Sequence, residues 1–319
     1  MESGRAVRGF VAAIAAAAVL SACSEVYVAQ DPTESDWVPF NYATTGLPAQ
    51  PETPRRPVVA VKIDNTAAGQ PQQGVAQADL VVQEPVEGGL TRLVAFYESR
   101  RPESVGPVRS IRTTDIPLTM PVSATVVTSG GSPEVLQEFE TANVPLVVEP
   151  NEIFVRNPNR PAPYDLYADL SQEIAGPLPK QEYLDFGDLD LPSGKQVDGM
   201  TIVFSDFAQT QWKATGKGQW KQLGTEQPYL ADTLLILSVD LIDTGLVDAA
   251  GSSVPEAAVV GNGRGFLALD GAVHTIRWEK TGFTEPFEFT TDQGLVIAVP
   301  PGNSWINLLP ESGGKVSFN

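Results

Sequence analysis

Runs of β-branched and other apolar residues recur through the first half of the chain and predict a sheet. The stretches at 57–63, 80–86 and 91–98 have the sequences PVVAVKI, LVVQEPV and TRLVAFYE, which are typical of buried strands. A pair of glycines lies between the second and third stretches. These two strands are therefore predicted to form an antiparallel hairpin.

Helical patterns alternate with further strands after this hairpin. The segment 110–120, SIRTTDIPLTM, predicts a helix broken at Pro117. The segment 132–143 begins with Ser132 as an N-cap and a proline in the first turn, which predicts a second helix. Strands are expected at 123–131 and 144–150. This alternation predicts an α/β domain with a mixed sheet over residues 41–170.

The last third of the chain has a different pattern. Short strands alternate with glycine turns from residue 199 to residue 319, which predicts a β-rich domain, either a sheet or an open barrel. The segment 171–198 combines acidic residues with glycine and proline and has weak periodicity. It is interpreted as an interdomain connection.

The first residues predict export and lipid anchoring. Arg5 and Arg8 precede an apolar run of about a dozen residues, which is short for a membrane span. The run ends in LSAC and resembles a bacterial lipobox, in which the cysteine carries the lipid, with palmitate among the expected acyl chains. We therefore expect a signal peptide at 1–22, lipidation of Cys23, a polar tether at 23–40 and a position on the outer face of the cytoplasmic membrane.

Composition narrows the possible partners. The chain has a formal net charge of -18 and 19% charged residues, so a broad basic face for nucleic acid is not expected. A single histidine, His274, excludes a multi-histidine metal site, and it is interpreted as an ordinary strand residue. The glycine-rich segment 128–134 lacks the spacing and the lysine of a P-loop. No metal and no cofactor are expected.

A local excess of arginine stands out against this acidic background. Between Lys62 and Lys180 there is no lysine. The basic residues of that interval are Arg92, Arg100, Arg101, Arg109, Arg112, Arg156 and Arg160. Arg109 and Arg112 are three residues apart and would share one face of a helical turn.

Three uses of these arginines remain open. They could pair with the chain's own carboxylates, for example Asp64, Asp79 or Glu87. They could bind an anionic ligand, because a guanidinium group grips carboxylate or phosphate through two parallel hydrogen bonds. They could also act in catalysis. The segment 128–134 is a second candidate anion site if its amides are free, or simply a glycine turn before a capped helix.

Two further features could serve chemistry on glycans. Asp64 and Glu87 could form a carboxylate pair for glycosidic acid–base catalysis. Tryptophans in the C-terminal part could stack on sugars, although tryptophans in sheets are more often core residues. These tryptophans are Trp212, Trp220, Trp278 and Trp305.

Four motifs together resemble the YerB-like bacterial lipoproteins. They are TGLPAQ…RRPVVAVKIDN, PQQGVAQADLVVQEPVEGGLTRLVAFY, VGPVRSIR and GGSP, in this order. The resemblance is strong over 43–170 and looser over 199–312. It implies a two-domain protein of the cell envelope, built from an N- and a C-terminal domain of unknown function.

The resemblance also implies a set of recurrent polar positions. They are Asp64, Asn65, Gln72, Glu87, Thr91, Arg92, Arg109, Ser110 and Arg112. Where relatives often carry histidine and asparagine, this chain has Tyr164 and Asp165, which favours binding over catalysis. The expected role is binding or scaffolding in the envelope, through an arginine-lined cleft that takes an anionic glycan, a peptide or a protein partner. The alternative is an envelope-glycan hydrolase or transferase that uses Asp64 or Glu87.

Overall fold

The computed structural model describes residues 38–188, 191, 194–248 and 251–319. The predicted signal peptide, Cys23 and most of the predicted tether lie outside the described residues.

Strands dominate the described residues of the N-terminal half. They are β1 Val59–Asp64, β2 Leu80–Pro85, β3 Thr91–Tyr97, β4 Thr125–Thr128, β5 Leu146–Val148, β6 Phe154–Arg156 and β7 Leu166–Ala168. The helical elements are η1 Ala67–Gly69, η2 Val75–Gln77, η3 Glu87–Gly89, α1 Asp115–Thr119, η4 Met120–Val122 and α2 Pro133–Thr141.

The described residues of the C-terminal half contain strands without helices. They are β8 Lys195–Gln196, β9 Gly199–Val203, β10 Gln209–Ala214, β11 Trp220–Gln222, β12 Leu230–Ala231, β13 Thr233–Val239, β14 Leu241–Val247, β15 Ser253–Ala257, β16 Gly261–Leu269, β17 Ala272–Lys280, β18 Glu288–Thr290, β19 Val296–Ile297, β20 Ser304–Pro310 and β21 Lys315–Phe318. This part confirms the predicted β-rich character.

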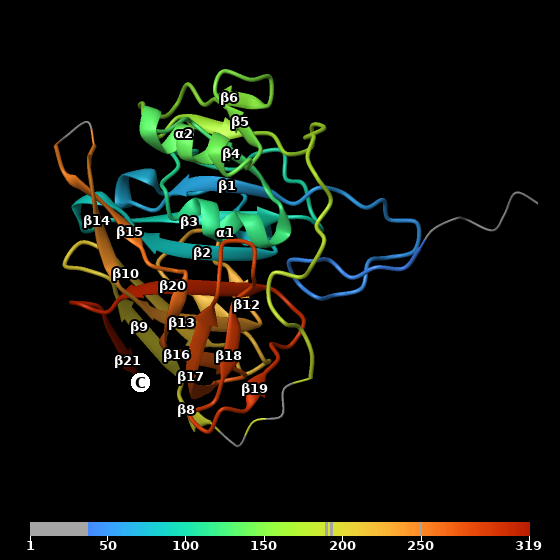
Figure 1. Ribbon diagram of the computed structural model, residues 1–319, viewed down its shortest axis with the longest axis vertical. Helices are drawn as coiled ribbons and strands as arrows, with labels where there is room; N and C mark the ends of the chain where they lie inside the picture. Colours follow the sequence, from blue (N-terminus) through green and yellow to red (C-terminus); the bar gives the residue numbers. More distant parts are fainter. Residues whose placement is uncertain (1–37, 189–190, 192–193, 249–250) are drawn as a thin grey trace, which may run out of the picture. The chain divides into compact units, whose positions relative to one another are not determined.

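Within the described residues, one large mixed sheet runs in the order β19-β18-β17-β16-β13-β20-β2-β3-β1-β4-β5, with β8 beside β17. The C-terminal strand β20 lies between β13 and β2 and is parallel to both. Figure 1 shows this strand beside β2. The two halves of the sequence therefore share one sheet, and the predicted domain boundaries remain predictions.

Smaller sheets complete the described architecture. One has the order β12-β11-β10-β9-β21, and two-stranded sheets form from β14 with β15 and from β6 with β7. The β14–β15 hairpin reaches the N-terminal half, where the amide of Ala257 donates to Thr114 Oγ1 over 3.0 Å. Figure 1 shows the hairpin alongside the N-terminal strands.

The predicted hairpin of β2 and β3 is confirmed, with Leu80 opposite Phe96 and Pro85 opposite Thr91. Every residue of β1, β2 and β3 is buried. Strands covered on both faces need no alternation of apolar and polar residues, which explains their continuous apolar runs.

The α/β prediction for the N-terminal domain is not supported, because helices contribute little to it. The helix at 132–143 is confirmed as α2, and Ser132 Oγ caps it by accepting from the amide of Val135. The helix predicted over 110–120 is wrong in extent, because α1 covers only Asp115–Thr119. Pro117 lies in its first turn, where a proline needs no amide donor. Arg109 and Arg112 therefore lie in a loop and share no helical face.

Two apolar cores cover the two faces of the large sheet. Alternation along β1 sends Ala60 into one core and Val61 into the other. Helices α1 and α2 pack on the first core through residues that include Leu118 and Phe139. The second core is closed by the five-stranded sheet through residues that include Trp212.

All four predicted C-terminal tryptophans are core residues rather than exposed sugar platforms. The exposed fraction is 2% or less for each of Trp212, Trp220, Trp278 and Trp305. His274 lies in β17, as predicted, and burial lowers its pKa. The segment predicted as a connection also packs, since Tyr183 and Leu184 are fully buried.

Candidate functional site

Three of the predicted arginines, Arg92, Arg109 and Arg112, gather where β1 ends, β3 begins and the loop before α1 passes. Asp64 is the last residue of β1, and its strand partner is Arg92 near the start of β3. The loop is attached to β1 because the amide of Arg109 donates to the carbonyl of Lys62 over 2.9 Å. Backbone pairing thus places side chains from distant parts of the sequence at one sheet end.

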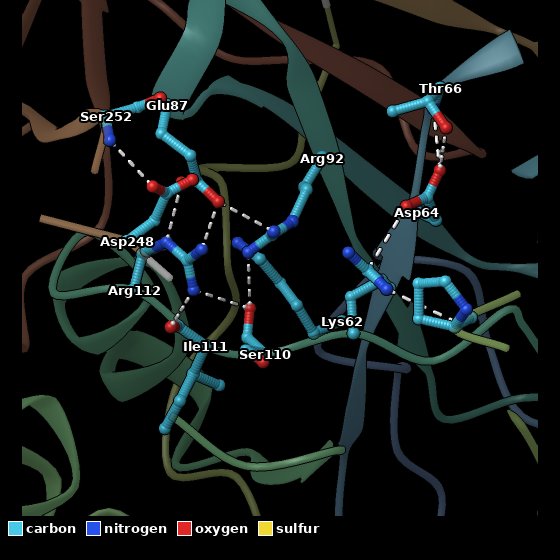
Figure 2. Close-up of polar contacts among 12 residues, drawn as sticks. Lys62, Asp64, Thr66, Glu87, Arg92, Ser110, Ile111, Arg112, Asp248 and Ser252 are labelled. Carbon is cyan, nitrogen blue, oxygen red and sulfur yellow. Dashed lines mark hydrogen bonds and ion pairs between the residues drawn. The ribbon is translucent and has the colours of Figure 1, made fainter. Parts of the chain in front are cut away.

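Glu87 is the centre of this cluster. Arg92 Nη2 donates to Glu87 Oε1 over 2.8 Å, and Arg112 Nε donates to Glu87 Oε2 over 2.9 Å. Arg112 Nη2 also donates to Oε1, so one guanidinium group grips both carboxylate oxygens. Figure 2 shows Glu87 facing both arginines.

The arginines keep Glu87 ionised. Burial opposes ionisation, but the hydrogen bonds from Arg112 and the charge of Arg92 outweigh it and lower the pKa of Glu87 to about 2. A carboxylate with this pKa holds no proton at neutral pH. It therefore cannot act as the general acid of a glycosidase there.

Arg92 and Arg112 also bond to backbone carbonyls. Arg92 Nη1 donates to the carbonyl of Ser110 over 3.1 Å, and Arg112 Nη1 donates to the carbonyl of Ile111 over 2.8 Å. Burial, followed by the charge of Arg112, lowers the pKa of Arg92 to about 10, so it stays cationic at neutral pH. The predicted pairing with the chain's own carboxylates is confirmed for these two arginines.

Arg109 is less satisfied than its neighbours. Its Nε lies 3.2 Å from Asp64 Oδ2, yet this buried nitrogen makes no hydrogen bond within the described residues. Its Nη1 donates to the carbonyl of Pro163 over 3.3 Å, and its Cζ lies 5.8 Å from the ring centre of Tyr164. The side chain is 23% exposed, the largest fraction among the three arginines.

These arginines line a cavity of about 370 Å³. Its charged lining consists of Arg92, Arg109 and Arg112 with the acids Glu87 and Asp248, so cations exceed anions by one. Gly131 and Ser132, at the start of α2, form another part of the wall, and Leu246 and Val254 come from the β14–β15 hairpin. The glycine-rich segment and the arginines, predicted as separate anion sites, therefore share one cavity.

The residues that line the cavity come from two segments of the chain, and each segment matches a domain of one protein family. A sequence model described as the N-terminal domain of a protein of unknown function, DUF3048, matches residues 44–183. The model of the C-terminal domain of the same family matches residues 204–306. The chain belongs to the DUF3048 family.

Two comparisons with Bacillus subtilis YerB agree with this membership. This DUF3048 chain is 36% identical to "Putative lipoprotein YerB" of Bacillus subtilis strain 168 over 97 residues. The aligned region covers 30% of this chain and 29% of that protein. The crystal structure of the YerB protein has a TM-score of 0.72 with 20% identity, covering 87% of this chain and 99% of that one. The latter likeness establishes the shared fold. In the described part of the chain, no helix has the length and apolar character needed to span a bilayer.

Sequence reasoning missed a buried layer of charge behind the DUF3048 cavity. Lys62 Nζ contacts Glu84 and donates to Asp115 Oδ1 over 2.6 Å, while Asp115 Oδ2 accepts from the amide of Arg112 over 2.7 Å. Burial lowers the pKa of Lys62 to about 8, although Asp115 opposes the shift. The available signal was Lys62 in β1 and Glu84 in β2, two ionisable residues in strands that are otherwise mainly apolar.

Not all predicted site residues reach the cavity. Ser110 lines it, and Asp64 lies behind Arg109, but Asn65 and Thr91 line a separate cleft. Asp79, a candidate partner for the arginines, instead accepts from the amides of Glu98 and Ser99.

The remaining arginines have other roles. Arg101 donates to the carbonyls of Tyr97 and Pro57, and Arg156 pairs on the surface with Asp165 and Glu149. Among the described residues, no group of three or more histidine, cysteine, aspartate or glutamate side chains is arranged to hold a metal ion.

Proposed function

We propose that this chain is a lipid-anchored protein of the cell envelope and that its arginine cavity binds an anionic group on a glycan, a peptide or a protein partner. The lipoprotein name of its Bacillus relative and the LSAC motif before Cys23 support the anchoring. Anchoring at Cys23 would place the described residues outside the cytoplasmic membrane.

The observation that carries the binding proposal is the state of Arg109. Among the described residues its Nε makes an ion pair with Asp64 but no hydrogen bond, its Nη1 has one long bond, and the side chain faces a cavity whose lining has one more cation than anions. In a chain with a net charge of -18, such a site attracts anions by local arrangement rather than by overall charge. Arg92 and Arg112 are already held by Glu87, so their role is to shape and charge the wall.

The alternative hydrolase gains less support from the geometry. Glu87 is ionised and bonded by two arginines. Asp64 is 2% exposed and accepts from the amide and the hydroxyl of Thr66. Both carboxylates are therefore engaged by donors of the protein itself.

The test is binding of purified protein to cell-wall fragments with and without their anionic polymers. We expect Arg109→Ala to weaken binding about tenfold, the loss of one charge-assisted hydrogen bond, and to lower the melting temperature without unfolding the protein, because the buried Asp64 loses its ion-pair partner. Arg156→Ala is the matched control, because that arginine pairs with acids on the exposed surface. Equal binding by wild type and Arg109→Ala would contradict the proposal. Release of wall fragments that is lost in Glu87→Gln would favour the enzyme.

A further inference from the structure

A second cleft lies on the opposite face of the large sheet from the arginine cavity. Thr91 and Arg92 are consecutive in β3, so their side chains point to opposite faces. Arg92 lines the cavity, whereas Thr91 lines a cleft of about 330 Å³ between the N-terminal half and the five-stranded sheet.

The lining of this cleft carries no charge. Fourteen described residues form it, and none of them is Asp, Glu, Lys, Arg or His. Charged residues make up 19% of the chain, so the uncharged wall contrasts with the rest of the protein. The polar groups of the wall are side-chain amides and hydroxyls, with Gln222, Thr91 and Thr225 among them.

The hydroxyl of Thr91 has an unused proton. Its oxygen accepts from Asn65 Nδ2 over 2.8 Å and from Gln83 Nε2 over 3.1 Å. The orientations of the two side-chain amides are fixed by their oxygens, because Asn65 Oδ1 accepts from Gln72 Nε2 and Gln83 Oε1 accepts from Thr210 Oγ1. With both acceptor positions of its oxygen filled, Thr91 can still donate its proton. No acceptor for it occurs among the described residues.

Gln222 provides an amide without a partner. The residue is 6% exposed, and its side chain lines the cleft. Its backbone amide donates to Tyr229, but its side-chain amide makes no hydrogen bond within the described residues. The buried hydroxyl of Thr225, also in the lining, has no hydrogen-bond partner there either. Gln222 and Thr225 therefore offer polar groups in this cleft that a ligand could engage.

Phe207 adds a flat apolar surface to the same lining. Its side chain is 78% exposed, the largest exposed fraction among the large hydrophobic residues of the described chain. An exposed aromatic ring beside amide and hydroxyl groups offers one apolar and one polar contact surface.

We infer that this cleft binds an uncharged glycan chain. Sugar hydroxyls donate and accept at once, which matches the free amide of Gln222 and the free protons of Thr91 and Thr225. The apolar C–H face of a sugar ring matches the ring of Phe207. A charged ligand would find no counter-charge in the lining. One common mode of binding an extended peptide uses an unpaired strand edge, whereas side chains supply the polar groups of this cleft.

The inference is tested by titrating the folded protein with the uncharged sugars chitotetraose and cellotetraose in calorimetry. Tetragalacturonate, which is charged, and an uncharged serine–alanine tetrapeptide are the comparison ligands. We expect at least one uncharged sugar to bind, and Phe207→Ala and Gln222→Leu each to weaken that binding about tenfold. Phe283→Ala, which removes another exposed ring, and Arg156→Ala, which removes a surface arginine, should bind the sugar as wild type does.

Gln222→Leu also has a stability readout. Because its side-chain amide has no hydrogen-bond partner among the described residues, replacement by leucine should leave the melting temperature unchanged or raise it. A large decrease would indicate a structural role for the amide and overturn the proposal. The proposal would also be overturned if neither uncharged sugar bound, or if both cleft variants bound the sugar as tightly as wild type. Tighter binding of the peptide or of tetragalacturonate than of the uncharged sugars would overturn it as well. None of these outcomes depends on the arginine cavity.

Discussion

At the start of β3, one face of the sheet carries charged side chains and the other face carries uncharged polar side chains. On one face, Arg92 joins a network in which guanidinium groups are matched by carboxylates. On the other face, Thr91 joins a network of amides and hydroxyls without charge. The alternation of side chains along β3 separates the two sites, although they are one residue apart in the sequence. Consecutive polar residues in a buried strand can therefore belong to unrelated sites.

Removal of the Glu87 carboxylate should give the largest difference in stability between the charged face and the uncharged face. Glu87→Ala leaves two buried cations without their partner, and we expect it to lower the free energy of unfolding by about 3–5 kcal/mol. Urea denaturation at pH 7 measures the change. Glu149→Ala removes a carboxylate that pairs with the half-exposed Arg156, and it should cost less than about 1 kcal/mol. Equal losses in the two variants would show that the Glu87 cluster is no stronger than a surface pair.

Acid should weaken the charged face. The pKa of Glu87 is about 2 in the folded protein and 4.5 ordinarily, so the unfolded chain takes up the proton first as the pH falls. Its contribution is complete above pH 4.5 and is lost between about pH 4.5 and 2, and a shift of this size corresponds to about 3 kcal/mol. Unfolding of wild type and Glu87→Gln across this range measures the difference. The variant should lose less stability than wild type, and parallel curves would contradict the assignment.

The uncharged face should be less sensitive to a single deletion. Thr210→Val removes the hydroxyl that donates to Gln83 Oε1 over 2.9 Å, and leaves that buried oxygen without this donor. We expect a loss of about 1–2 kcal/mol, because a neutral buried group costs less to leave unpaired than a charged one. Thermal unfolding at pH 7 measures it, with Thr141→Val on the exposed surface of α2 as control. A loss as large as that of Glu87→Ala would remove the energetic contrast between the faces.

The sequence predicted correctly those helices and strands whose signals lie within a few residues of one another. The hairpin of β2 and β3 and the capped helix α2 were both predictable, because turn glycines and an N-cap serine act within a few residues. The helix before residue 115 was wrongly extended, since the loop is instead held by a bond from the amide of Arg109 to the carbonyl of Lys62. That bond joins residues far apart in the chain and leaves no local signal.

The candidate site was predicted only in part for the same reason. The sequence identified the arginines and Glu87 as candidates, but not that Glu87 binds two of them and leaves Arg109 less satisfied. It also grouped Asn65 and Thr91 with the arginines, although they line another cleft. Motif order along the chain carries no information about which face of a sheet a residue occupies.

The sequence by itself determined the family, the set of polar residues and the LSAC motif that predicts export and lipidation, because these depend on residue identity and short spacing. Only the tertiary structure decided that β20 joins the two halves in one sheet and that the β14–β15 hairpin completes the arginine cavity. The physical reason is that strand pairing and side-chain burial bring together residues whose separation along the chain is large, and the backbone register decides on which face each one lies.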